Sequence, residues 1–140
     1  MLTREILNGY LKLKENKEQI EEEIREFYET CIQSTLITDA PKNPQITDVT
    51  ATLAEKAEKM HVNLAYAKRE MAVSFDIIVN AIADLDTNLR LVIYYKYIRG
   101  LNGKEIAEAM SYHESRIWQF HGDALKILFK KKIMENYLEL

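Results

Sequence analysis

The stretch from Gly100 to Met110, GLNGKEIAEAM, decides the fold of this chain. A helix is predicted over residues 86–99, and Gly100 is the residue type that takes a left-handed conformation at a helix C-terminus without strain. Asn102 can cap the next helix, and Glu105 follows at the spacing of a capping box. The stretch therefore predicts the turn of a helix-turn-helix and the short helix that follows it.

A third helix is predicted to begin near His113. Apolar residues recur along it at helical spacing, and the preceding short helix is apolar on one face. The inward residues of these two helices are Ile106, Ala107, Met110, Ile117, Phe120, Ala124, Leu125 and Leu128. The pattern predicts a helix-turn-helix domain over residues 85–140.

This pattern resembles region 4 of the sigma-70 family, a four-helix unit that reads the promoter −35 element. The residues that carry the resemblance are Leu85, Val92, Ile93, Tyr97, Gly100, Leu101, Glu105, Ile106, Ala107, Glu108, Met110, Ile117, Ala124, Leu125 and Leu128. Its place at the end of a 140-residue chain, behind an acidic helical segment, is similar to the ArpU/RinA-type regulators of phages and prophages of Gram-positive bacteria. The resemblance implies a transcription regulator that activates late genes, with double-stranded DNA and RNA polymerase as partners.

Two long amphipathic helices are predicted upstream, over residues 3–36 and 49–83. Their apolar residues recur in heptads, which is typical of helices that pack along one seam. In the first helix the seam residues are Ile6, Tyr10, Leu13, Ile20, Ile24, Phe27 and Cys31. In the second they are Leu53, Ala57, Met60, Leu64, Ala67, Met71, Ser74 or Phe75, Ile78 and Ile82. The helices are expected to fold back as an antiparallel pair or to meet copies of themselves in a homodimer.

A break separates the two long helices at residues 37–47. Pro41 and Pro44 fix φ and remove backbone donors, so no helix is expected to continue through them. We therefore predict an all-α chain. A helical hairpin or coiled-coil segment occupies residues 1–84, with its linker at 37–47, and the sigma-70 region 4-like domain occupies residues 85–140.

Charge is divided unequally between these two segments. Residues 1–84 carry 10 Lys or Arg and 15 Asp or Glu, a net charge of −5. Residues 85–140 carry 9 and 7, a net charge of +2. A DNA-binding domain needs local positive potential rather than a basic whole chain. The sign of this difference agrees with nucleic-acid binding at the C-terminal end.

The first turns of the third helix are expected to face the base edges of a major groove. Glu114 can accept a hydrogen bond from a cytosine amino group, and Gln119 can pair with adenine. Ser115 suits several bases, and Trp118 can pack on a thymine methyl or on the sugar backbone. The sigma family commonly has Arg at the positions of Glu114 and Trp118, so this chain lacks those two cations.

Phosphate contacts are predicted around this face. The residues assigned to them are His113, Arg116, Lys104 and Arg99. Lys130, Lys131 and Lys132 follow on the same helix, where they either favour the helix dipole or contact phosphate.

Enzymatic, metal-binding and membrane functions are not expected. The three histidines lack Cys or carboxylate neighbours at metal-ligand spacing, and no glycine-rich phosphate loop is present. The chain has one cysteine, Cys31, so it cannot form an intramolecular disulfide. No apolar run approaches the ~20 residues of a membrane helix, and the N-terminus lacks the order of a signal peptide. We expect a cytoplasmic protein that needs no cofactor or metal.

Two functions remain open from the sequence. The first is a sequence-specific transcription activator that uses the third helix to read DNA. The second is a helical protein-interaction module, which binds another regulator or RNA polymerase on a helix-turn-helix scaffold without binding DNA. The two differ in the surface around Glu114, Trp118 and Gln119, which should be positive and exposed in the first case and neutral or buried in the second.

Overall fold

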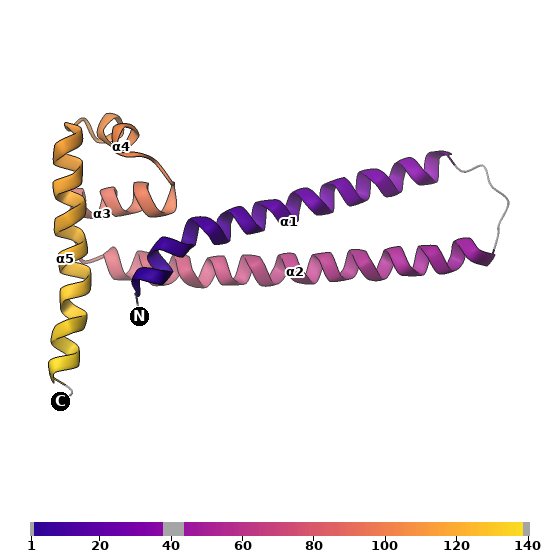
Figure 1. Cartoon of the computed structure of the whole chain (residues 1–140), viewed down its shortest axis with the longest axis horizontal. Coiled ribbons are helices and arrows are strands. Elements are labelled where there is room, and N and C mark those ends of the chain that lie inside the picture. Colours follow the sequence, from indigo (N-terminus) through magenta and orange to yellow (C-terminus); the bar gives the residue numbers. More distant parts are fainter. Residues whose placement is uncertain (1, 38–43, 139–140) are drawn as a thin grey trace. The chain divides into compact units, whose positions relative to one another are not determined.

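The computed structural model describes residues 2–37 and 44–138, with side chains described over 2–31 and 50–130. The described residues form helices joined by short turns and contain no strand, which confirms the predicted all-α fold class. The helices are α1 (Arg4–Ile37), α2 (Pro44–Ile82), α3 (Thr87–Ile93), the π-helical turn η1 (Tyr94–Ile98), α4 (Gly103–Met110) and α5 (Glu114–Leu138) (Figure 1). None of the described helices combines the length and the apolar character that crossing a membrane requires.

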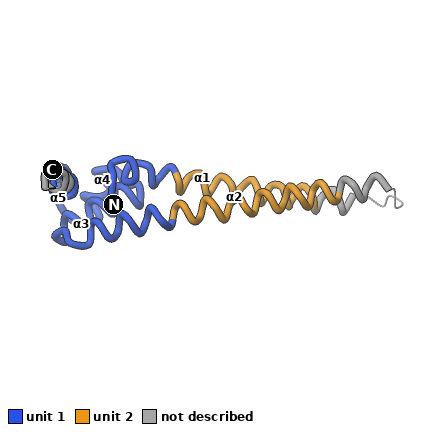
Figure 2. Tube along the Cα trace, turned by 90° about the horizontal axis from the view of Figure 1, so that it is seen from below, with its two compact units in different colours: residues 1–12, 72–140 blue, residues 13–71 orange. Residues whose placement is uncertain are grey.

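The chain divides into two compact units, which are coloured in Figure 2. One unit is Leu13–Met71, and the other combines Met1–Lys12 with Ala72–Leu140. Helices α1 and α2 therefore each contribute residues to both units. The sequence analysis placed a boundary after residue 84. The division into units differs from it, because the buried residues at the start of α1 and at the end of α2 belong with the C-terminal helices.

In the unit Leu13–Met71, α1 and α2 run side by side in opposite directions (Figures 1 and 2). This is the first of the two arrangements that the heptads allowed. The Tyr28 hydroxyl lies 2.8 Å from Nε2 of His61, and Nζ of Lys56 lies 5.7 Å from the centroid of the Phe27 ring. The seam residues are buried or half-buried apart from Leu53, which is 37% exposed, contrary to its predicted inward position.

The start of α2 also differs from the prediction. The helix begins at Pro44, earlier than the predicted Val49. Proline is well suited to the first position of a helix, where its fixed φ is helical and the missing N–H has no partner to lose. The other linker proline, Pro41, lies outside the described residues.

In the C-terminal unit, α3 and α4 both pack against α5. The spacing of the apolar residues explains this, because Ile117, Phe120 and Ala124 recur on one face of α5 and are all buried. Other buried members of this core are Leu7, Tyr10, Ile78, Ile82, Leu85, Leu89, Val92, Ile93, Ile98, Ile106 and Ala107. Leu7 does not belong to the predicted heptad rows, although it is only 2% exposed.

The turn before α4 has the predicted caps. Gly100 has a φ of +72°, and the Asn102 side chain accepts a hydrogen bond of 2.9 Å from the backbone N–H of Glu105. The turn after α4 is also left-handed, because Ser111 caps that helix with a φ of 59°. This second left-handed position was not predictable from the sequence, since serine has no special preference for that conformation.

The helix predicted over 86–99 is not a continuous α-helix. After α3 the chain widens into η1, where the N–H of Arg99 donates to the carbonyl of Tyr94 over 3.2 Å. Leu101 N–H then donates to the Tyr95 carbonyl over 3.0 Å, which closes the helix end at Gly100. A π-turn inserts a residue into the helical register, and so it turns the side chains after it relative to those of α3.

Candidate nucleic-acid interface

The N-terminus of α5 is capped by His113, as expected for a residue at the helix start. The carbonyl of His113 accepts from the N–H groups of Arg116 and Ile117 at 3.0 and 3.3 Å. Its Nδ1 accepts from the N–H of Ser115 at 3.3 Å and lies 2.9 Å from the Ser115 hydroxyl. Because Nδ1 is the acceptor, the neutral ring carries its proton on Nε2, where it can donate to an external group.

Arg116 and Gln119 form a linked pair on the exposed face of α5. Nη1 of Arg116 donates to Oε1 of Gln119 over 3.1 Å, and the guanidinium carbon lies 4.9 Å from the centroid of the Phe120 ring. Both side chains are exposed. The pair and the ring together restrict the guanidinium, which keeps further donors for a phosphate or a base.

Trp118 and Glu114 lie against the start of α4 rather than projecting freely from α5. A Cβ at the buried Gly103 would stand 2.8 Å from Cζ2 of Trp118 and 3.0 Å from a carboxylate oxygen of Glu114. Nζ of Lys96 lies 4.5 Å from the centroid of the indole. Trp118 remains 44% exposed, whereas Glu114 is half-buried. Both residues therefore help to join α5 to α4.

A half-buried polar cluster, which no sequence pattern indicated, lies beneath Trp118. His121 contacts the indole edge-on, and its Nε2 lies 2.7 Å from the hydroxyl of Tyr97. Burial and the nearby Lys96 lower the pKa of His121. Burial raises the pKa of Tyr97, an effect that Arg4 partly offsets. The sequence could have indicated only that Trp118 and His121, three residues apart on α5, are neighbours. Lys96 and Tyr97 belong to the π-helical turn η1, which was not predicted.

The remaining predicted contacts are spread more widely. Lys104 is exposed on the first turn of α4. Arg99 is exposed at the end of η1, with its guanidinium carbon 5.9 and 5.8 Å from the rings of Tyr94 and Tyr95. Lys130 is exposed on α5 but lies ~21 Å along the helix from Arg116 at ~1.5 Å per residue. The side chains of Lys131 and Lys132 lie outside the described residues.

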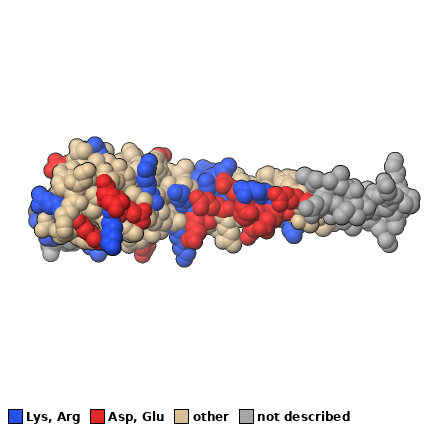
Figure 3. All heavy atoms as spheres, turned by 90° about the horizontal axis from the view of Figure 1, so that it is seen from above, with Lys and Arg blue, Asp and Glu red and all other residues tan. Residues whose placement is uncertain are grey.

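The charges near the start of α5 are of both signs. Lys96, Lys104 and Arg116 are offset by Glu105, Glu108 and Glu114. Figure 3 shows the two signs interspersed over the visible face of the C-terminal unit, and acidic side chains gathered along the long helical pair. The predicted reading face is thus exposed at His113, Ser115, Arg116 and Gln119, and the three basic and three acidic side chains named around it balance in charge.

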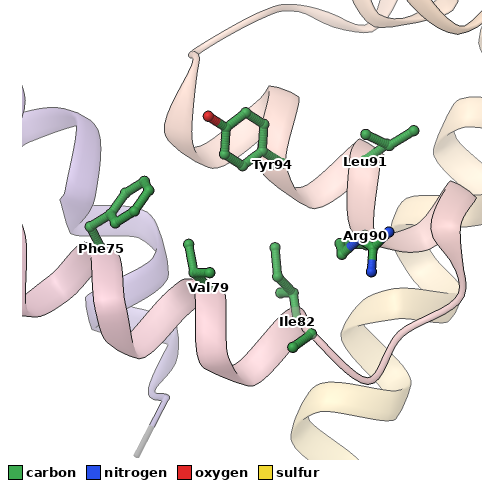
Figure 4. Close-up of a pocket in the computed structure, with 7 residues that line it drawn as sticks. Phe75, Val79, Ile82, Arg90, Leu91 and Tyr94 are labelled. Atoms are coloured by element: carbon green, nitrogen blue, oxygen red, sulfur yellow. The ribbon is translucent and has the colours of Figure 1, made fainter.

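A separate apolar pocket of about 440 Å³ lies between the end of α2 and the α3–η1 segment (Figure 4). Phe75, Val79 and Ile82 of α2 point toward Leu91 and Tyr94 on the other side. Ala83 and Arg90 complete the lining. Its volume suits an apolar side chain or a small apolar ligand, but it offers few polar groups to orient a metabolite.

In the part of the chain that the structure describes, no group of three or more His, Cys, Asp and Glu side chains is arranged to hold a metal ion. Cys31 is half-buried on α1.

Comparison with models of protein families, with curated proteins and with solved structures finds no match to this chain.

Proposed function

We propose that this protein is a sequence-specific DNA-binding transcription regulator that reads a major groove with the first turns of α5. The observation that carries the proposal is the exposed polar face of α5 at His113, Ser115, Arg116 and Gln119, supported from behind by α3 and α4. A short helix, a turn and a second helix whose N-terminal residues are polar and accessible is the arrangement by which helix-turn-helix proteins dock.

The residues divide into base and phosphate contacts under this proposal. Oε1 of Gln119 has a second lone pair, so Gln119 can pair with an adenine while it still accepts from Arg116. His113 Nε2, Arg116 and Lys104 supply donors for phosphates on either side of the groove. Trp118, held over Gly103, presents its exposed edge to the sugar backbone. Because acidic side chains balance the cations around this face, binding should depend only weakly on salt.

The resemblance to sigma-70 region 4 and to ArpU/RinA-type regulators supports the regulatory part of the proposal. On that basis the protein activates phage or prophage late genes from the cytoplasm and contacts RNA polymerase at their promoters. A homodimer would place two reading helices on half-sites about one helical turn of DNA apart.

Two observations favour the second candidate, a protein-interaction module. The apolar pocket beside Tyr94 can take an apolar side chain of a protein partner, and Glu114 opposes phosphate binding near the reading face. In that case the α4–α5 pair is a scaffold, and the partner is another regulator or a polymerase subunit.

The test is the binding of the full-length protein to DNA fragments from its own genomic neighbourhood at two salt concentrations. Arg116→Ala removes a cation at the reading face, and Lys126→Ala removes one from an exposed position further along α5. We expect site-specific binding that Arg116→Ala weakens by about tenfold, with a reduced salt slope, and that Lys126→Ala leaves within about twofold.

The two candidates predict different outcomes of this experiment. Equal loss in both variants would mean that charge alone drives the binding, and no reading face would be needed. If no fragment binds specifically, while Val79→Glu in the apolar pocket abolishes a complex with a purified polymerase subunit, the protein-interaction module is the better description.

A further inference from the structure

Two cations lie on one flank of α5, outside the reading face. Nζ of Lys96 lies 4.5 Å from the centroid of the Trp118 indole, and the guanidinium carbon of Arg4 lies 5.1 Å from the centroid of the Phe129 ring. Arg4 is exposed and Lys96 is half-buried. Both belong to the compact unit that contains α5, although Arg4 is the first residue of α1. We call Lys96 and Arg4 the flanking cations.

Packing and backbone geometry hold the flanking cations in place. The hydroxyl of Thr3 accepts from the backbone N–H of Ile6 over 3.1 Å, and the buried Leu7 anchors this first turn of α1 in the core. Lys96 belongs to η1, where the π-turn changes the direction of its side chain relative to those of α3. The burial of Leu7 therefore brings Arg4 beside α5, and the π-turn does the same for Lys96.

The charge of the flanking cations is not neutralised by an ion pair with any side chain that the structure describes. Glu5, the carboxylate next to Arg4 in the sequence, lies about 100° from it around α1. Burial and then Lys96 lower the pKa of His121, and burial raises the pKa of Tyr97, an effect that Arg4 partly offsets. Aromatic rings attract cations but leave their charge in place. This flank therefore attracts an anion.

The position of the flank around α5 indicates which anion it meets. At about 100° per residue, Trp118 and Phe129 lie about 20° apart around the helix, and Gln119 of the reading face lies about 100° from Trp118. A helix about 10–12 Å across fills a major groove about 12 Å wide, so a DNA strand passes along each flank of a helix that reads bases. The flanking cations thus lie where a strand passes when Gln119 faces the bases.

The spacing of the flanking cations favours a strand over a small anion. Trp118 and Phe129, the rings that they contact, are ~16 Å apart along α5 at ~1.5 Å per residue. One phosphate or carboxylate cannot bridge that distance, whereas a DNA strand carries a phosphate about every 3.4 Å along the helix axis. We propose that Lys96 and Arg4 contact phosphates of the strand beside the groove that α5 reads. This inference rests on the proposed function, and it adds a contribution of α1 to DNA binding.

The test is the binding of the full-length protein to duplex DNA, measured by fluorescence anisotropy over a range of salt concentrations. Two duplexes of equal length are compared, namely the genomic fragment that binds most tightly and a scrambled sequence. Arg4→Met and Lys96→Met remove the charge and keep an unbranched stem over the ring. Each should raise the Kd about fivefold on both duplexes and reduce the salt slope by about one ion. Because the charges around the reading face balance, this is a large share of a small slope.

Lys12→Met is the matched control. Lys12 is another exposed cation of α1, and it lies about 80° around the helix from Arg4 and about 12 Å along it. This variant should bind within about twofold of the wild type with an unchanged salt slope. Circular dichroism identifies any variant that has lost its fold, and Arg4→Gln or Lys96→Gln then replaces it. A cation that only stabilises the ring beneath it would leave the salt slope unchanged.

The outcomes separate this inference from the proposed function. If the wild type binds and both methionine variants keep its affinity and salt slope, the flanking cations do not contact DNA, and the reading face of α5 is unaffected. Equal losses in Lys12→Met and the two variants would mean that affinity follows net charge alone, which also overturns the inference. A wild-type protein that binds neither duplex overturns the proposed function and this inference together.

Discussion

Trp118 lies across Gly103, so close that a Cβ at position 103 would stand 2.8 Å from Cζ2 of the indole. Glycine is thus required here for close approach, because it has no side chain between the first turn of α4 and the ring of α5. The contact fixes the first turns of α5 against α4. Any reading face on α5 therefore depends on a residue of the preceding helix.

Gly103→Ala is expected to destabilise the protein by about 1–3 kcal/mol, the usual cost of overpacking. The entropy that alanine removes from the unfolded chain offsets less than about 1 kcal/mol of this. Urea unfolding followed by circular dichroism measures the loss in every variant, and the fluorescence of Trp118, the single tryptophan of the chain, reports a local displacement where the ring is present. In a Trp118→Ala background the same substitution should be neutral or stabilising. Equal losses in the two backgrounds would mean that the ring is not the obstacle.

Asn102→Ala removes the side-chain acceptor that caps α4. We expect a loss of about 1 kcal/mol, because the backbone N–H of Glu105 loses its partner. Asn102→Asp keeps an acceptor oxygen at the same position and should lose much less. Chemical denaturation of the three proteins measures the difference, and two variants of equal stability would contradict a capping role.

Gly100 and Ser111, the two residues with left-handed backbone on either side of α4, should change stability in opposite directions when glycine is removed from one and introduced at the other. Ser111→Gly relieves the strain of a non-glycine residue at φ 59° and is expected to stabilise by up to about 1 kcal/mol. Gly100→Ala introduces such strain at φ +72°, and its Cβ would meet Cδ2 of Leu11 at 3.3 Å. It should destabilise by about 1–2 kcal/mol. Differential scanning calorimetry checks both signs, and a Ser111→Gly variant that melts lower would refute the argument.

Stability is expected to fall as the pH is lowered through about 6.5, the pKa of a histidine in an unfolded chain. Burial and Lys96 lower the pKa of His121 in the folded protein, so the unfolded chain takes up this proton first and acid favours unfolding. His121→Gln keeps a polar partner for Tyr97 without titrating, and its stability should depend less steeply on pH between about 5 and 7. The control is His61→Gln in the helical pair. Parallel pH profiles for wild type and His121→Gln would exclude this contribution.

The link between Arg116 and Gln119 makes their effects on DNA binding non-additive. Gln119→Ala removes a base contact and also releases the Arg116 guanidinium, so its effect should shrink in an Arg116→Ala background. Gln119→Ala should relax preference at one base position, whereas Arg116→Ala should weaken binding to all sequences. Fluorescence anisotropy with a set of single-base variants of the site measures both. Strictly additive losses would indicate that the two side chains act separately.

Local chemistry made several features predictable from the sequence. Gly100 and Asn102 have few conformational alternatives at a helix end and a helix start, and both have the predicted geometry. The apolar spacing of Ile106, Ile117 and Ala124 predicted their burial, because residues that recur at helical spacing share one face of a helix and an apolar face packs against the core. The two prolines indicated a break between the long helices, although α2 starts at the second of them.

The sequence by itself determined the all-α class, the roles of Gly100 and Asn102 in the turn before α4, and the inward faces of α4 and α5, since these follow from propensity and periodicity within one segment. Tertiary structure decided the π-turn at Tyr94–Ile98, the left-handed Ser111, the burial of Leu7 and the position of Trp118 on Gly103. None of these features has a local sequence signal, and the burial of Leu7 and the position of Trp118 depend on the packing of residues that are distant in the chain. The same packing lowers the pKa of His121, which no spacing along α5 could have indicated.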